Sequence, residues 1–196
     1  CGAGHKNIDH KNSIENIIIN TSADINEKNW TKGHILNEGN KIKVKISRDK
    51  DEQTLKIKAK EQYWKRFKSF YIKFNEDIKL LNEWVYHRML LNEGVLSTRY
   101  NIARLTLNNK NEGVIAYEES FEKQLIEYNH RREGPILKFS SSSLEVDAFK
   151  MKRILEKPNL KRSFNAGKSL LKSYKQGTLK ASDIFDINIM AKFMAI

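Results

Sequence analysis

The feature of this sequence that most constrains its fold is a wide apolar stripe between residues 60 and 92. Apolar and aromatic side chains recur there at steps of three and four residues, and no proline or glycine occurs in this segment before Gly94. The residues on the stripe are Tyr63, Phe67, Phe70, Phe74, Ile78, Leu81 and Val85. This spacing predicts one long amphipathic helix over residues 60–92, which would be about 50 Å long at 1.5 Å per residue.

Shorter segments with a similar periodicity follow, and they predict partner helices for the long one. The predicted helical segments are residues 95–107, 114–132, 146–155, 159–175 and about 179–194. Polar or glycine-containing breaks separate them, and the Gly134-Pro135 pair ends the second. The predicted fold class is therefore mainly α, a helical bundle around one long helix at about 60–92.

One stretch before the long helix has the period of a β-strand instead. Residues 41–46 and 55–60 alternate between apolar side chains and lysines, around a charged connector from Arg48 to Gln53. This pattern predicts a small N-terminal β-hairpin at about 41–47 and 54–60, with one apolar face and one lysine face. The alternative is a helix that begins at Ser47 or Asp49 and continues into the long one.

Length and composition predict the domain organisation. The 196 residues suffice for one domain, and 39% hydrophobic with 31% charged residues is typical of a folded globular chain. We expect residues 1–13 to form a flexible tether and residues 14–196 a single domain, with loops and the hairpin over 14–60 and the bundle over 61–196. No apolar run approaches 18 residues, which excludes a transmembrane helix.

The positive charge is concentrated near the C-terminus. The net charge is +12, and residues 148–196 carry eleven lysines and arginines against three acidic residues, a surplus of eight. Such a field favours nucleic acid, an anionic membrane or wall polymer, or an acidic protein partner, and the alternative is a solvated lysine-rich surface. Only nine of the 36 basic residues are arginines. This argues against nucleic acid as the partner, because base readout favours arginine.

No residue pattern in the sequence matches a catalytic or metal site. Residues 165–169 resemble the end of a phosphate-binding loop, but Arg162 stands where that loop needs a glycine. The five histidines are scattered, and Glu127 with His130 has the spacing of a bundle metal motif without the second copy that the motif requires. We therefore predict no enzyme activity, no metal, no cofactor and no small-molecule substrate.

The single cysteine is Cys1, so no intramolecular disulfide can form. Cys1-Gly2-Ala3-Gly4, followed by a polar segment, resembles the mature start of a surface lipoprotein of low-GC Gram-positive bacteria. That resemblance implies a lipid on Cys1 and a lipid-anchored position at the outer face of the cytoplasmic membrane. Lipoproteins of this size in such bacteria include immunity proteins, and one of them neutralises a lipase toxin exported by the type VII system. The alternative is a trimmed N-terminus.

These features together predict a membrane-anchored extracytoplasmic binding protein. Its function would be that of an immunity or inhibitor lipoprotein that sequesters a secreted protein toxin such as a lipase. The candidate partner-binding residues are aromatic residues of the long helix and basic residues of the C-terminal quarter. They are Trp64, Tyr71, Trp84, Tyr86, Arg153, Lys161, Arg162, Lys168 and Lys172. The alternative for the aromatics is packing between two layers. The alternative function is a basic nucleic-acid-binding helical protein of a mobile element.

Overall fold

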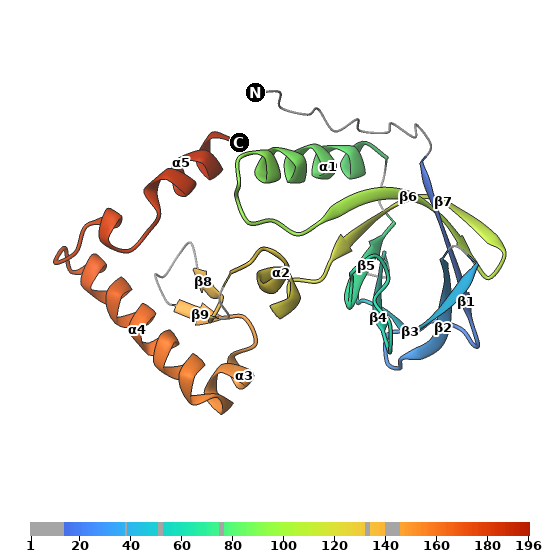
Figure 1. Cartoon of the computed structure of the whole chain (residues 1–196), viewed down its shortest axis with the longest axis horizontal. Helices are drawn as coiled ribbons and strands as arrows, with labels where there is room; N and C mark the ends of the chain where they lie inside the picture. Colours follow the sequence, from blue (N-terminus) through green and yellow to red (C-terminus); the bar gives the residue numbers. More distant parts are fainter. Residues whose placement is uncertain (1–13, 38, 51–52, 75–76, 132–133, 140–145) are drawn as a thin grey trace, which may run out of the picture. The chain divides into compact units, whose positions relative to one another are not determined.

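The computed structural model describes residues 14–37, 39–50, 53–74, 77–131, 134–139 and 146–196 (Figure 1). The predicted tether over residues 1–13 therefore lies outside the described residues. The chain divides into two compact units, the first formed by residues 1–87 and 98–120 and the second by residues 88–97 and 121–196.

The first unit is a closed β-barrel of seven strands. These are β1 (Glu15–Thr21), β2 (Thr31–Asn37), β3 (Asn40–Arg48), β4 (Thr54–Ala59), β5 (Ser69–Lys73), β6 (Tyr100–Leu107) and β7 (Lys110–Glu119). Their order around the barrel is β1-β2-β3-β4-β5-β7-β6, and parallel pairing of β1 with β6 closes it, while the other pairs are antiparallel. The predicted mainly α helical bundle is therefore wrong. The predicted hairpin is present as β3 and β4.

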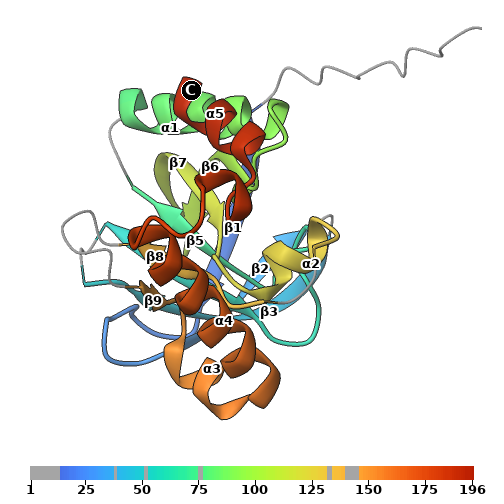
Figure 2. The ribbon, with the colours of Figure 1, turned by 90° about the vertical axis from the view of Figure 1, so that its left-hand side faces the viewer.

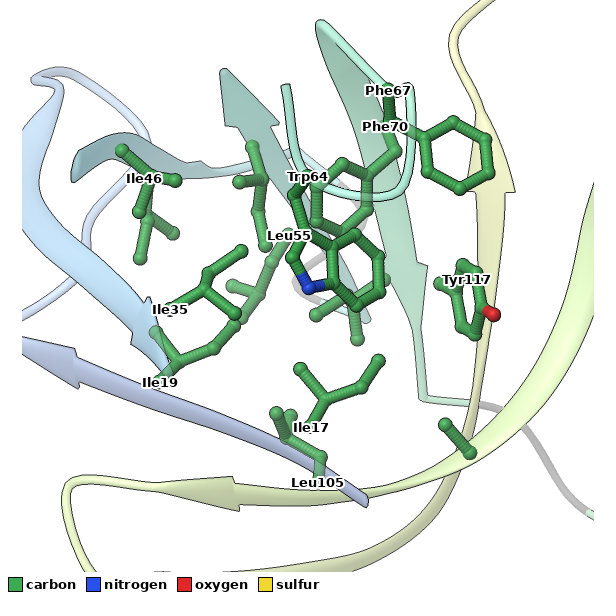
Figure 3. Packing of buried hydrophobic residues seen from close by; sticks show 14 of the residues in the cluster. Ile17, Ile19, Ile35, Ile46, Leu55, Trp64, Phe67, Phe70, Leu105 and Tyr117 are labelled. Atoms are coloured by element: carbon green, nitrogen blue, oxygen red, sulfur yellow. The ribbon is translucent and has the colours of Figure 1, made fainter. Parts of the chain in front are cut away.

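The barrel interior is filled by side chains from alternate positions of its strands (Figure 3). In β3, for example, Ile42, Val44 and Ile46 are buried while the lysines between them are exposed. Trp64 occupies the same interior, where its ring stacks on Phe70 at 4.7 Å between centroids. Because an inward-facing residue follows every outward-facing one, this core explains the strict alternation of the β3 and β4 sequences.

The long helix predicted over residues 60–92 is wrong in its first half. Strand β5 occupies residues 69–73, and only α1 (Asp77–Asn92) is helical. Phe70 and Ile72 point into the barrel and Tyr71 points outward, which is the period of a strand. The steps of three and four from Tyr63 to Phe74 arise from a tight turn followed by a strand, so they resemble a helical stripe by coincidence.

Two further predicted helices, over residues 95–107 and 114–132, are also wrong, because most of this segment is the β6–β7 hairpin. The polar break between them is its turn, in which Asn108 and Asn109 have φ of 50° and 65°. A two-residue turn with both φ values positive matches the twist of the flanking strands, and asparagine tolerates this conformation better than most residues. Only α2 (Lys123–Tyr128) is helical in the second segment.

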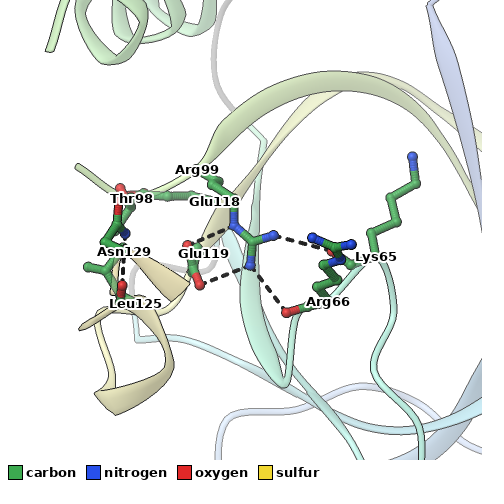
Figure 4. A network of polar contacts seen from close by, with 8 residues as sticks. All are labelled: Lys65, Arg66, Thr98, Arg99, Glu118, Glu119, Leu125 and Asn129. Carbon is green, nitrogen blue, oxygen red and sulfur yellow. Dashed lines mark hydrogen bonds and ion pairs between the residues drawn. The ribbon is translucent and has the colours of Figure 1, made fainter. Parts of the chain in front are cut away.

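A tight turn from Trp64 to Phe67 places Trp64 in the barrel. The backbone N–H and C=O groups of these two residues bond each other, and Lys65 and Arg66 between them have φ of 47° and 66°. Arg99 holds this turn, since its guanidinium donates hydrogen bonds to the carbonyl oxygens of Lys65 at 3.3 Å and Arg66 at 3.2 Å (Figure 4). Arg99 also lies over the Phe67 ring, 3.9 Å from its centroid.

The second unit contains α2, the strand pair β8 (Leu137–Phe139) and β9 (Val146–Ala148), and four helical segments (Figures 1 and 2). The helical segments are α3 (Met151–Glu156), α4 (Pro158–Lys175), the 3₁₀ turn η1 (Ala181–Asp183) and α5 (Ile187–Ala195). The predicted helix over 159–175 is confirmed as α4. The helices predicted over 146–155 and 179–194 each correspond to two shorter elements. Ala148, Ile154, Leu160 and Phe164 form the apolar cluster of this unit.

Among the described residues, no helix has the length and apolar character needed to span a membrane.

Candidate functional site: a lysine groove along helix α4

Helix α4 has one apolar side and carries only positive charge elsewhere. Leu160, Phe164 and Leu171 are buried, and Pro158 occupies the first turn, where its missing N–H costs no helical hydrogen bond. The helix contains five basic residues and no acidic one. The amphipathic helix therefore buries its apolar face against its own unit and presents a net charge of +5 to its surroundings.

Gly167 explains how close α4 comes to the β8–β9 pair. A Cβ atom at this position would lie 3.2 Å from the Cδ1 atom of Leu137 on β8, tighter than an ordinary van der Waals contact. The glycine that resembles part of a phosphate-binding loop therefore permits close packing of a helix on a strand. The lysine and serine that follow it, Lys168 and Ser169, line a groove beside the strands.

This groove has a volume of about 720 Å³ and lies between α4 and strand β9. Its lining residues are Val146, Asp147, Asn165, Lys168, Ser169, Leu171, Lys172 and Lys175. A volume of this size is within the range of protein ligand sites. Two apolar side chains, three amines and two neutral polar groups line the groove, with a single carboxylate, so it favours a ligand that combines negative charge with some apolar surface.

The three lysines of the groove share one side of the helix. Lys168, Lys172 and Lys175 follow each other at steps of four and three, which places them in one row along the helix axis. All three are exposed. Within the described part of the chain, none of them takes part in an ion pair. Among the described residues, no ion pair neutralises these three charges, and Asp147 is the single carboxylate that lines the groove.

The basic residues predicted from the sequence are only partly brought together. Lys168 and Lys172 line the groove, and Lys161 is exposed two steps earlier in the same helical row, before Asn165. Arg162 is exposed but lies about 100° further round the helix axis, because each residue turns an α-helix by that angle. Arg153 lies on α3 and lines a separate pocket of about 50 Å³, which is too small for an organic ligand.

The aromatic residues predicted with them lie in the first unit and do not form one surface. Trp64 is only 2% exposed and belongs to the barrel core. Trp84 packs on the cluster of Leu80, Tyr100 and Ala116, which attaches α1 to the outer side of the barrel. Tyr71 is partly buried on β5, and Tyr86 on α1 is 40% exposed. The packing alternative therefore describes Trp64 and Trp84.

Sequence reasoning missed Asn165, Ser169 and Lys175 as groove residues. Residues 161, 165, 168, 172 and 175 follow one another at steps of four and three, so this row was visible in the sequence of a correctly predicted helix. What the sequence did not show was the other wall, because Val146 and Asp147 belong to a segment predicted as helical that is the strand β9.

The structure also reveals a cluster of titratable groups between α1 and the barrel, in the first unit. Lys73 Nζ lies 2.7 Å from Glu118 Oε2 and 3.2 Å from Glu83 Oε2, and its ammonium group is 5.5 Å from the centroid of the Tyr100 ring. The His87 ring stacks on Tyr100 at 4.9 Å. These groups come from α1, β5, β6 and β7, and thereby tie the helix to three strands.

The pKa values in this cluster shift in the direction that its charges require. Burial alone lowers the pKa of Lys73, but hydrogen bonds and attraction from Glu118 and Glu83 outweigh burial and raise it. Burial raises the pKa of Tyr100, and the nearby carboxylates raise it further. Among the described residues the Tyr100 hydroxyl makes no hydrogen bond of good geometry, although the Glu83 carboxylate is close enough to affect its pKa. A protonated lysine between two carboxylates, packed beneath a helix, stabilises that helix on the barrel.

Metal ligands are not grouped in the part of the chain that the structure describes, where no three His, Cys, Asp or Glu side chains lie close enough to hold an ion.

Comparison with known proteins adds no family to this picture. No protein-family model and no curated protein matches the chain. Functional inference therefore rests on the geometry of the groove and on the charges around it.

Proposed function

We propose that this protein is a binding protein of the inhibitory type, and that the groove along α4 holds an acidic segment of a protein partner. The observation that carries this proposal is the row of Lys168, Lys172 and Lys175, which lines the groove without an ion-pair partner among the described residues. An acidic partner would supply the missing carboxylates and would be steered to this face by its positive field.

The lining of the groove supports a protein partner over a nucleic acid. Leu171 and Val146 contribute apolar surface between the lysines, and Asn165 and Ser169 can donate and accept hydrogen bonds. A peptide segment presents carboxylates and apolar side chains within a few residues of each other. A nucleic-acid backbone presents phosphates without comparable apolar groups, and its bases are read best by arginines, of which the groove has none.

The filled interior of the barrel supports a binding role as well. Its inward-facing side chains pack against each other, as the Trp64, Phe67, Phe70 and Tyr117 rings do at centroid separations from 4.7 to 6.5 Å. Such an interior is a rigid core, as in other small barrels whose lumen is filled by side chains. The function proposed for this chain accordingly uses its surface.

The identity of the partner as a secreted toxin such as a lipase stays a prediction, as does anchoring through a lipid on Cys1. Both depend on the resemblance of residues 1–4 to surface lipoproteins, and these residues are outside the described part.

Capture from the secreted proteins of the producing organism tests the proposal. The wild-type protein is compared with the triple variant Lys168→Glu, Lys172→Glu and Lys175→Glu. The control carries the same change at three exposed lysines of the first unit, Lys28, Lys50 and Lys60. We expect one acidic protein to be retained by the wild type and the control and lost by the groove variant. That protein, once purified, should bind the wild type in isolation.

Two results would contradict the proposal. Equal retention of the partner by the groove variant would place the interface elsewhere. Retention of nucleic acid in place of a protein, with loss in the groove variant, would replace the proposed partner class by the alternative one.

A further inference from the structure

A second basic surface lies on the barrel, where lysines of three neighbouring strands stand directly opposite each other. The register pairs Lys32 of β2 with Lys45 of β3, and Lys45 with Lys58 of β4. All three side chains are exposed on the outer face of the barrel. We call these three residues the lysine ladder.

We propose that the lysine ladder binds a base-free phosphodiester polymer, with repeating polyol phosphate units, through the negative charges of its backbone. This inference concerns the first unit and is independent of the function proposed for the α4 groove.

The arrangement of the ladder is unfavourable for folding alone. Like charges directly opposite each other on neighbouring strands destabilise a sheet, and Lys45 has a lysine on both sides. No ion pair within the described residues involves Lys32, Lys45 or Lys58. The ion pair on the same face, between Lys43 and Glu61 at 3.4 Å, is itself largely exposed. A bound polyanion would remove this repulsion.

The spacing of charges on this face suits a linear polymer. The ladder amines start from strands about 4.8 Å apart, and Lys41, Lys43 and Lys45 follow each other along β3 at intervals of about 6.7 Å. The surface therefore offers positive charge at intervals of several ångströms in two directions. A flexible chain with one negative charge per repeat can follow such a grid, and binding would release the counterions of both partners.

The aromatic side chains beside the ladder argue for a polymer without bases. Trp30 has the ammonium group of Lys58 over its ring at 4.8 Å, and Tyr71 has that of Lys56 at 5.4 Å. Each ring thus has a lysine on it, whereas a surface for single-stranded nucleic acid offers rings on which bases stack. The ladder also consists of lysines, which bind phosphate as point charges, and contains no arginine for bidentate readout.

Direct binding measurements test this inference with defined probes. Labelled poly(glycerol phosphate), oligo-dT of equal charge and phosphatidylglycerol vesicles are titrated with the full chain at several salt concentrations. The ladder variant carries Lys32→Gln, Lys45→Gln and Lys58→Gln, and its control carries the same change at the exposed residues Lys152, Lys157 and Lys180. The melting temperature of each variant is measured alongside, which separates loss of binding from loss of folding.

We expect poly(glycerol phosphate) to bind the wild type and the control alike, and the ladder variant at least about tenfold more weakly at low salt. The slope of log K against log salt should fall by about 2 in the ladder variant, since roughly 0.7 is lost for each phosphate contact with a flexible chain. Absence of binding at low salt, or equal binding by the ladder variant, would overturn the inference. Tighter binding of oligo-dT, or binding of vesicles alone, would overturn the polymer class.

Discussion

The contact between Arg99 and Glu119 gives the sharpest test of how this barrel is held together. Glu119 is only 2% exposed, and the Arg99 guanidinium donates to both of its carboxylate oxygens, from Nε at 2.9 Å and from Nη2 at 3.0 Å. We expect Arg99→Met to lower the free energy of unfolding by about 3–5 kcal/mol. The reason is that the substitution leaves a buried carboxylate without its partner and frees the turn carbonyls of Lys65 and Arg66.

A double-mutant cycle separates the ion pair from the turn. When Glu119→Leu accompanies Arg99→Met, no charge is left buried, and the double variant should be more stable than Arg99→Met alone by at least about 2 kcal/mol. It should remain below the wild type because Arg99 no longer bonds the turn. The control is Lys110→Met, which breaks an ion pair with Glu112 at 3.1 Å whose lysine is exposed, and should cost no more than about 0.5 kcal/mol.

Urea unfolding followed by tryptophan fluorescence measures these values, because all three tryptophans lie in the first unit. Strict additivity of the two substitutions would refute the reasoning, since it would mean that the buried carboxylate gains nothing from the guanidinium. A cost below about 1 kcal/mol for Arg99→Met would do so as well.

Three further predictions concern the barrel. Trp64→Ala should lower the free energy of unfolding in urea by about 3–5 kcal/mol, because it opens a cavity in the filled interior. Lys45→Thr should raise the free energy of unfolding at low salt by about 0.3 kcal/mol, because the substitution removes the middle charge of the lysine ladder. Added salt should reduce this gain. Tyr100 should resist ionisation in an alkaline absorbance titration, because its pKa is raised above 10.0, its value in an unfolded chain. The folded state then holds a proton that the unfolded state releases, so stability contributed by Tyr100 is complete below pH 10.0 and falls as pH rises further, and Tyr100→Phe should weaken this fall.

The sequence predicted correctly those parts of the fold in which the spacing of apolar residues fits only one kind of secondary structure. In β3 and β4 apolar residues alternate with lysines, and a helix would spread such a pattern around all its sides. In α4 apolar residues recur at helical steps, with lysines and an arginine on the other sides of the helix. Each of these elements buries one face against its own unit. Local pattern and tertiary packing therefore demand the same structure there.

The segment from residue 60 to 120 could not be assigned in this way. The spacing of Tyr63, Phe67, Phe70 and Phe74 fits a helix as well as it fits a turn followed by a strand, and only pairing with β4 and β7 selects the strand. Helix α1 is apolar on several sides, with Leu80 buried while Ile78 and Leu81 are about half exposed. A partner strand that is distant in sequence decides these cases, and no local window contains it.

The two basic surfaces differ in a way that makes their functions separable. The α4 groove combines Lys168, Lys172 and Lys175 with the apolar side chains of Leu171 and Val146, so part of any binding free energy there comes from burial of apolar surface, which salt does not screen. The lysine ladder offers charge on a sheet whose aliphatic side chains face the barrel interior, and the Trp30 and Tyr71 rings beside it are each covered by a lysine, so binding there depends mainly on counterion release. A partner of the groove should consequently keep measurable affinity at high salt, whereas a polymer on the ladder should be released. The same salt titration thus assigns a ligand to its surface before any residue is changed.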